Sequence, residues 1–392
     1  MIDFEIPDEV NMVRDTVARF VEDKLLPLER EVGFIEEDIP LDTMRELRTQ
    51  LRELGLLNLM APVSQGGAGF GQRDMAVIHE AQARSLFGGN IWRGTGMPEM
   101  LKRFSKEQQE KFQAKADADD LFGCFCLTDP TSGSDPSSMV TSFVRDGDNY
   151  ILNGRKIFIS GAHMADYATI YAREVGTTRK EGINAFLVDT DQPGFTAKVI
   201  ATMGRPTSTS TDACEVSLDD CIVPEQCRLT NEGSGGGSGW GSAQGTLAGI
   251  RFAMGARSVA LSTRCLEMAL EYSKHRVTFG ETISNRQSVQ NMMADSHIEI
   301  STTRLLTHYG AWKQDMGMDA RQEISMLKVL ATETLGNVVD RAIQIHGGMG
   351  ITKELPLEKI YRNARVDRIV DGPNEVHRWV IARNLLKDGI LP

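Results

Sequence analysis

The 392-residue sequence predicts an α+β protein of several domains: an N-terminal α-helical domain, a central antiparallel β domain and a C-terminal four-helix bundle. Two observations predict this order. Apolar residues recur at helical spacing near both ends of the chain, whereas short β-branched and aromatic runs crowd the middle. The expected boundaries are 1–120, 121–233 and 234–392. A chain of this length is able to bury a separate core in each part.

The first domain is expected to open with two amphipathic helices. Val10, Val13 and Val17 recur at helical spacing, and Pro27 is expected to end that helix. The next apolar stripe is followed by Gly55, a typical C-terminal cap.

The middle of the chain has the pattern of strands. Tyr150–Leu152 and Lys156–Ile159 flank Asn153-Gly154, and Asn-Gly is a strong signal for a tight hairpin. Strands at this density without helices between them favour a sandwich or a barrel. Further strands are expected at Cys124–Thr128, Ala168–Ala172, Ala185–Val188, Thr196–Ile200 and Cys214–Leu218.

The last part begins with a stretch typical of a linker. Residues 231–245 are rich in Gly and Ser, which favours a flexible connection. Long helical patterns follow, and their number suffices for a four-helix bundle. The expected helices are about 246–277, 286–316, 321–346 and 374–387.

Charge and composition exclude several classes of protein. Lys and Arg number 43 against 54 Asp and Glu, a formal net charge of −11, which argues against a nucleic-acid partner. No apolar run approaches the length of a membrane span, and the acidic N-terminus does not resemble a secretory or organelle leader. The six cysteines form no C-x-x-C pair. Reduced thiols in a cytoplasmic protein are therefore expected.

Several common catalytic motifs are missing from the sequence. It contains no G-x-G-x-x-G or Walker lysine pattern, so a nicotinamide Rossmann site and a P-loop are disfavoured. The seven histidines show no metal-ligand spacing, and there is no G-x-S-x-G elbow. No metal is expected.

Three stretches remain as candidates for chemistry. Phe125–Asp135 passes from a strand into a hydroxyl-rich turn that offers N–H groups to a polar ring or a phosphate. Ala342–Ile351 ends a helix in a Gly-Gly pair, which permits close approach to the backbone. Arg368–His377 carries Asp371 in a turn before the final helix. Taken singly, each is also typical of an ordinary loop or helix cap.

Taken together and in this order, the stretches resemble the acyl-CoA dehydrogenase family over essentially the whole chain, and that family has the three-domain fold predicted above. The matched motifs are T-[ED]-P-x-x-G-S-D within Phe125–Asp135, N-G-x-K-x-[WF]-I-[ST] at Asn153–Ser160, R-x-x-F-G at Arg276–Gly280 with Gln287 downstream, Q-x-x-G-G-x-G at Gln344–Gly350 and, loosely, a glycine-rich loop at Pro62–Gly69.

The resemblance implies FAD as the cofactor. Thr128 matches a residue that hydrogen-bonds the pyrimidine edge of the flavin, and Ser160 matches a hydroxyl near flavin N5. A second set of residues matches positions that bind the ADP half of FAD, partly across a subunit boundary: Arg276, Phe279, Gln287, Gln344, Gly347 and Gly348. The full set implied is Phe125, Leu127, Thr128, Gly133, Ser134, Phe158, Ser160, Arg276, Phe279, Gln287, Gln344, Gly347 and Gly348.

The resemblance also implies the reaction: α,β-dehydrogenation of an acyl-CoA thioester to the 2-enoyl-CoA, with hydride transfer to flavin N5. Asp371 occupies the position of the catalytic base, where most members carry Glu. Some members place the base on the first bundle helix instead, where this chain has Ile250. An Asp in D-G-P-[ND]-E-V-H resembles the branch of family members ten and eleven. Ser134, Arg251 and Arg383 are the implied substrate-binding residues.

The resemblance further implies a homotetramer built as a dimer of dimers, electron transfer flavoprotein as the electron acceptor, and a place in fatty-acid β-oxidation. Two other hypotheses stay open. One is a nitroalkane-oxidase-like flavoenzyme, which shares the fold and uses an Asp base. The other is a flavin- or acyl-CoA-binding subunit with little turnover.

Overall fold

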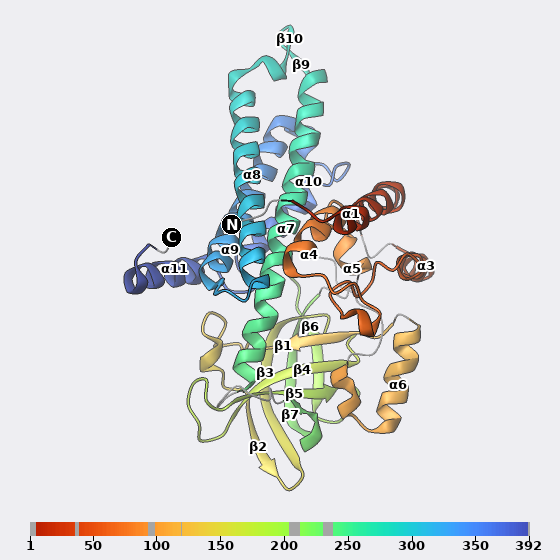
Figure 1. The fold of residues 1–392 in the computed structure, drawn as a ribbon, viewed down its shortest axis with the longest axis vertical. Helices are drawn as coiled ribbons and strands as arrows, with labels where there is room; N and C mark the ends of the chain where they lie inside the picture. Colours follow the sequence, from red (N-terminus) through yellow and green to blue (C-terminus); the bar gives the residue numbers. More distant parts are fainter. Residues whose placement is uncertain are drawn as a thin grey trace. The chain divides into compact units, whose positions relative to one another are not determined.

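The structure, a computed structural model, describes residues 5–35, 39–92, 99–118, 120–203, 212–229 and 238–390 (Figure 1). The chain forms two compact units, one of Met1–Arg93 with Ala248–Pro392 and the other of Gly94–Leu247. The predicted order of helical, β and helical segments is confirmed. The boundaries at 120 and 233 remain predictions.

The N-terminal part of the first unit is helical. Pro27 does not end the first helix, because a π-helical turn lies just before it and the proline then falls in the first turn of α2, where no N–H is needed. Gly55 does follow a helix end, with φ +68° and its N–H donating to Arg52 O at 2.9 Å. The elements are α1 (Asp8–Phe20), η1 (Val21–Leu25), α2 (Leu26–Glu31), α3 (Leu41–Glu53), η3 (Val63–Gln65), α4 (Gln72–Gln82) and α5 (Gly88–Ile91).

The long helices of the bundle follow the predicted stripes, and one shorter helix was missed. Helix α10 buries Leu357, Ile360 and Ala364, an i, i+3, i+7 stripe that the sequence does contain. The elements are α7 (Ser238–His275), β9 (Val277–Thr278), β10 (Glu281–Thr282), η7 (Ile283–Asn285), α8 (Gln287–Asp315), α9 (Arg321–His346), η8 (Gly347–Ile351), α10 (Leu357–Asp367) and α11 (Asn374–Asp388).

The expected linker at 231–245 is partly wrong. Residues 230–237 lie outside the described residues, but α7 already begins at Ser238. Packing overrides the low helix propensity there: a Cβ on Gly239 would come within 2.7 Å of the Asn184 backbone, and Ala243 is fully buried. The glycine is therefore required for a close helix–strand contact.

The second unit is built on an eight-stranded sheet. Its path runs β6-β7-β3-β2-β4-β5-β8, with β1 pairing β4. Most pairs are antiparallel, as predicted, but β2 and β1 each run parallel to β4. The elements are η4 (Glu99–Arg103), α6 (Lys106–Asp117), β1 (Gly123–Cys126), η5 (Pro136–Ser138), β2 (Ser142–Asp146), β3 (Asn149–Ser160), β4 (Tyr167–Glu174), β5 (Ile183–Asp189), β6 (Phe195–Val199), β7 (Ala213–Pro224), η6 (Glu225–Cys227) and β8 (Arg228–Leu229).

The hairpin predicted at Asn153-Gly154 is wrong. Both residues lie inside the continuous strand β3, where the register with β7 shifts between Leu152 and Gly154. Gly154 has φ +145°, and a Cβ there would lie 2.7 Å from Thr141 Cα. The pair therefore forms a β-bulge, and the real turn lies between β2 and β3, at Gly147 with φ +58°.

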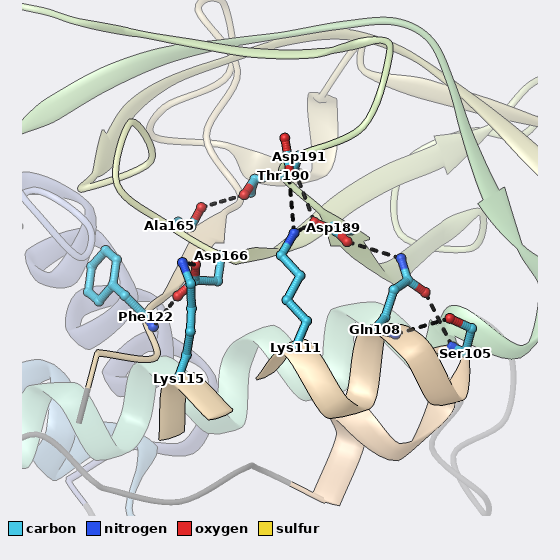
Figure 2. A network of polar contacts seen from close by, with 10 residues as sticks. All are labelled: Ser105, Gln108, Lys111, Lys115, Phe122, Ala165, Asp166, Asp189, Thr190 and Asp191. Atoms are coloured by element: carbon cyan, nitrogen blue, oxygen red, sulfur yellow. Dashed lines mark hydrogen bonds and ion pairs between the residues drawn. The ribbon is translucent and has the colours of Figure 1, made fainter. Parts of the chain in front are cut away.

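Helix α6 is fastened to the sheet by charged side chains (Figure 2). Lys111 Nζ lies 3.2 Å from Asp191 Oδ2 and 3.6 Å from Asp189 Oδ1. One turn on, Lys115 pairs with Asp166, a carboxylate that is almost completely buried. These contacts, all within the second unit, hold α6 near the start of β4 and the end of β5.

All six cysteines are buried and free, as predicted for reduced thiols. Among the helices in the described ranges, none combines the length and apolar character that a bilayer span requires. Within the same ranges, no cluster of His, Cys, Asp or Glu could hold a metal ion.

A fully buried ion pair lies inside the second unit. Lys156 and Asp129 are 0% and 1% exposed, and Lys156 Nζ lies 2.6 Å from Asp129 Oδ1. The second oxygen, Asp129 Oδ2, accepts the N–H groups of Val140 and Thr141 at 2.6 and 2.7 Å. Lys156 also donates to Leu127 O at 2.9 Å. Both charges are therefore compensated without water.

We predict that Lys156→Met destabilises the protein by about 3–5 kcal/mol, because it leaves the Asp129 charge buried without its partner. Chemical denaturation monitored by circular dichroism measures this. The neighbouring Arg155→Met is the matched control, since the Arg155–Glu215 pair is exposed and is expected to contribute under about 1 kcal/mol. Equal effects of the two substitutions would contradict the role given to the buried pair.

Candidate active site

The first candidate surface is the turn that follows β1. Leu127 is buried, and Thr128 is half-buried with its carbonyl accepting the Ile157 N–H at 2.9 Å. Because Lys156 bonds Leu127 O on one side and Asp129 on the other, the backbone at Thr128 is fixed from both sides. The side chain of Thr128 is thus presented on a rigid support.

The turn continues through a run of small polar residues. Gly133 and Ser134 are exposed, and a Cβ at Gly133 would meet nothing within 4 Å. Ser132 is buried, and its hydroxyl has no partner among the described residues. A buried hydroxyl without a partner beside open backbone suits a polar ligand.

Two aromatic residues flank this turn. Phe158 adopts φ +58° at the second register shift of β3, and its side chain is 62% exposed. A bulky residue in the left-handed region is a backbone outlier that costs about 1–3 kcal/mol, and such strain concentrates at ligand sites. Phe125 is half-buried against the Tyr171 ring, with centroids 5.0 Å apart. Ser160 ends β3 and is exposed.

These residues form one surface in the second unit, because the Thr128–Ile157 hydrogen bond joins the β1 turn to the Phe158 bulge. The surface combines an exposed aromatic face, a fixed threonine and an unpartnered hydroxyl. It fits a planar ring with a polar edge, such as the flavin that the sequence motifs imply.

In the first unit, a second group of predicted residues gathers at the ends of the long helices. Arg276 follows α7, Gln287 begins α8, and Phe279 forms the turn of the β9–β10 hairpin with φ +49° and 99% exposure. Gln344, Gly347 and Gly348 lie at the exposed end of α9.

The two sets of helix ends lie side by side. The rings of Tyr272 in α7 and His346 in α9 stack with centroids 4.6 Å apart. Gly347 follows with φ +59°, a conformation that favours glycine. An exposed arginine, an exposed aromatic ring and open glycine backbone suit a nucleotide with a pyrophosphate.

Asp371 lies at a different place in the first unit, in the turn between α10 and α11. It adopts φ +56°, and three donors hold its carbonyl oxygen: Arg251 Nη2 at 2.8 Å, Arg251 Nε at 3.2 Å and His377 Nε2 at 3.3 Å. Among the described residues, none hydrogen-bonds its carboxylate or accepts from its backbone N–H. The backbone is therefore fixed while the carboxylate and the N–H stay available.

The surroundings favour a basic carboxylate at this position. Burial raises the pKa of Asp371 above its usual value, and the positive charges of Arg251 and Lys328 oppose that rise only in part. Burial and Arg251 together lower the pKa of His377 to about 4, so the imidazole is neutral at neutral pH. Its Nε2 must then carry the proton donated to Asp371 O.

Two other predicted residues have different surroundings. Ile250 precedes Arg251 on α7 and is 39% exposed, so the alternative base position carries no acid. Arg383 is exposed on α11, with its guanidinium 4.7 Å from the centroid of the Trp379 ring, and it makes no contact with Asp371.

Sequence reasoning missed three residues around Asp371: His377, Lys328 and Asn374. His377 and Asn374 lie within the quoted D-G-P-[ND]-E-V-H stretch, which was a signal in itself. Lys328 is 43 residues upstream in an ordinary helical stripe, and no local pattern marks it.

Comparison with known families identifies the chain. The family models of the acyl-CoA dehydrogenase N-terminal, middle and C-terminal domains match residues 7–116, 124–221 and 237–386. Together they cover most of the chain, which therefore belongs to the acyl-CoA dehydrogenase family. The resemblance and the fold predicted from sequence are confirmed.

Similar curated proteins act on CoA thioesters, by their names. Acryloyl-CoA reductase (NADH) of Anaerotignum propionicum is 30% identical over 98% of this chain and 96% of its own length. (R)-Benzylsuccinyl-CoA dehydrogenase of Thauera aromatica is 30% identical over 99% and 98%. Human short-chain specific acyl-CoA dehydrogenase, a mitochondrial protein, is 31% identical over 98% and 91%.

Solved structures agree over the same length. Butyryl-CoA dehydrogenase of Megasphaera elsdenii is 28% identical with TM-score 0.81, covering 98% of this chain and 100% of that one. A glutaryl-CoA dehydrogenase of Mycobacterium smegmatis in complex with FADH2 is 26% identical with TM-score 0.79, covering 99% and 97%. A chain of the electron transferring flavoprotein structure of Acidaminococcus fermentans is 30% identical with TM-score 0.83, covering 99% and 100%.

Proposed function

We propose that this chain is a FAD-dependent acyl-CoA dehydrogenase that converts an acyl-CoA thioester to the 2-enoyl-CoA, with Asp371 as the base. The observation that carries the proposal is a half-buried carboxyl group on a backbone held by three donors to one carbonyl oxygen. Family membership supplies the class of substrate, since the relatives named above are dehydrogenases and reductases of CoA thioesters.

Bound FAD would supply the acceptor for the hydride that leaves Cβ. The chain itself must take the proton from Cα, and Asp371 does so as a carboxylate whose raised pKa makes it a stronger base than an exposed aspartate. The free N–H of Asp371 is available to the thioester oxygen, where negative charge develops. Since the base must be ionised, the rate rises with pH through the pKa of Asp371.

Aspartate is one methylene shorter than the family's usual glutamate, about 1.5 Å less reach. The left-handed backbone of Asp371 sets where the shorter side chain begins. The substrate then has its α-carbon closer to this turn, or carries a branch or substituent that brings it there.

The cofactor residues fall into two sets. Phe125, Leu127, Thr128, Phe158 and Ser160 would hold the flavin ring, with Gly133 and Ser134 at the phosphates. Arg276, Phe279, Gln287, Gln344, Gly347 and Gly348 would hold the ADP half. Of the substrate-binding residues, Ser134 and Arg383 would contact the CoA, and Arg251 would act by fixing the turn of Asp371.

The second set serves a neighbouring subunit. Arg251 and Arg276 are separated by the unbroken helix α7, which places them roughly 37 Å apart along its axis. A single FAD reacting beside Asp371 cannot also reach Arg276 of the same chain. The proposal is therefore a homotetramer built as a dimer of dimers, in which the helix ends bind the neighbour's cofactor.

Electron transfer flavoprotein is the proposed electron acceptor. A chain with this fold occurs in the electron transferring flavoprotein structure of Acidaminococcus fermentans, which supports such a pairing. Fatty-acid β-oxidation is one pathway in which the proposed dehydrogenation would take place. Two relatives are named for other acyl groups, (R)-benzylsuccinyl-CoA and acryloyl-CoA, and one of them is named as a reductase, so the candidate substrates extend beyond fatty acids.

We predict that the purified protein is yellow and that an acyl-CoA bleaches it anaerobically. The panel is butyryl-CoA, isobutyryl-CoA, 3-hydroxybutyryl-CoA, 3-phenylpropionyl-CoA and benzylsuccinyl-CoA, followed by absorbance of the oxidised flavin. Nitroethane is the comparison compound. Bleaching by nitroethane alone would favour the nitroalkane oxidase, and bleaching by no compound would favour a binding subunit.

Asp371→Asn is expected to lower the rate of flavin reduction by about 10²–10⁴-fold, because the amide cannot accept the α-proton. FAD and acyl-CoA binding are expected to persist, since size and hydrogen bonding are kept. Asp371→Glu is the companion variant, expected to lose activity on the preferred substrate and to gain it on straight-chain acyl-CoAs. Flavin reduction by Asp371→Asn at the wild-type rate would place the base elsewhere.

Arg276→Met is expected to lower FAD occupancy by about tenfold or more in the tetramer. The reason is that the pyrophosphate of FAD loses the charged guanidinium that donates two hydrogen bonds to it. Absorbance ratios and sedimentation of the same samples measure occupancy and assembly. Arg286→Met is the matched control, since that arginine also lies in the α7–α8 connection but pairs with Glu281. A flavin-loaded monomer would contradict the shared site.

A further inference from the structure

Lys328 is a buried lysine whose position in the fold is unusual. It lies on α9, is 0% exposed, and its Nζ donates to Asn374 Oδ1 at 2.8 Å. A lysine is almost never fully buried unless its charge is compensated. The structure must therefore supply a compensating group nearby.

Asn374 connects Lys328 to the turn of Asp371. It is the first residue of α11, three positions after Asp371, and its N–H donates to Arg368 O at 3.1 Å across that turn. Its side chain also contacts Thr332 Oγ1 on α9 at 3.0 Å. Lys328 and Thr332 of helix α9 thus hydrogen-bond the first residue of α11. We expect these bonds to limit how far the turn can move.

The charges around Asp371 come from four helices. Arg251 and Arg257 act on it from α7, Lys328 from α9 and Asp367 from α10, while His377 of α11 bonds its carbonyl oxygen. Glu375, also on α11, acts on Lys328. Arg257 is paired with Asp367, Nη2 to Oδ2 2.6 Å, and Arg251 is bound to the Asp371 carbonyl. These two cations are therefore already engaged.

Lys328 has no carboxylate within ion-pair distance among the described residues; its bonded partner there is the neutral amide of Asn374. Burial lowers the pKa of Lys328 to about 8, and the negative charge of Asp371 is the first of the effects that oppose this. At neutral pH the ammonium is mostly protonated. The negative charges of Asp367 and Glu375 also oppose the fall in its pKa, and the hydrogen bond to Asn374 places the ammonium behind the turn of Asp371.

We propose that Lys328 is a positioning residue for Asp371: through Asn374 its ammonium fixes the turn that carries the base, and its charge favours the ionised carboxylate. This inference rests on the proposed function, in which Asp371 is the base. It assigns to α9 a direct part in setting the pH range of the enzyme.

The test is the pH profile of anaerobic flavin reduction by the panel acyl-CoA that the wild type oxidises fastest. Lys328→Met removes the charge, so the acid limb should move to higher pH, with a rate about tenfold lower at a fixed pH on that limb. Lys328→Arg keeps the charge and should restore the midpoint. Asn374→Ala keeps the ammonium but removes the bridge, so it should lower the limiting rate with a smaller shift of the midpoint.

A second readout does not depend on turnover. Hydrogen exchange of the peptide 369–376 should be faster in Asn374→Ala and Lys328→Met than in the wild type, because the turn has lost its support. Lys313→Met is the matched control, since Lys313 is largely buried in the same unit and pairs with Glu323 on α9. It should leave both the midpoint and the exchange of this peptide unchanged.

The outcomes separate the two proposals. An unmoved acid limb in Lys328→Met, together with an inactive Asp371→Asn, overturns the role of Lys328 alone. Wild-type flavin reduction by Asp371→Asn overturns the base assignment instead. If Lys328→Met does not fold, Lys328→Arg and Asn374→Ala still test the role of Lys328. Unchanged hydrogen exchange of the peptide 369–376 in Asn374→Ala would show that the hydrogen bond between Lys328 and Asn374 does not hold the turn.

Discussion

The ion pair of Lys156 and Asp129 is the constraint on which the candidate flavin surface depends. Two full charges lie 2.6 Å apart without solvent, and each is satisfied by further hydrogen bonds. The pair ties the end of β1 to β3, and Thr128 and Phe158 take their positions from those two segments. Removing either charge would expose the other to an apolar interior. The first unit has a similar arrangement: the buried ammonium of Lys328 hydrogen-bonds Asn374, three residues after Asp371. Each unit thus has a buried lysine behind a turn of its candidate site.

Much of this arrangement could be predicted from sequence, and the failures have physical causes. Short motifs located Thr128, Phe158, Arg276 and Asp371, because each motif contains the local backbone that presents the side chain. Asn153-Gly154 was misplaced because a glycine at positive φ serves a β-bulge as well as a hairpin, and only the pairing with β7 decides. Lys328 could not be found, because its partner is 46 residues away and a lysine on a helix is usually solvated.

The turn that carries Asp371, the proposed base, is held in part through one backbone oxygen. Its carbonyl oxygen receives three donors from α7 and α11, and its left-handed φ directs the side chain from that fixed point. Arg251 contributes two of its five N–H donors, from Nε and Nη2, to this oxygen. The same geometry leaves the carboxylate and the N–H of Asp371 without a hydrogen-bond partner among the described residues.

Phe158 has a consequence for the newly made chain. Its aromatic ring is mostly exposed, which offers an apolar contact to other molecules. Its left-handed backbone also raises the free energy of the folded state. A ligand that covers the ring stabilises the folded state by mass action. A copy that has not bound its ligand would therefore be the less stable form and the one more exposed to aggregation and proteolysis.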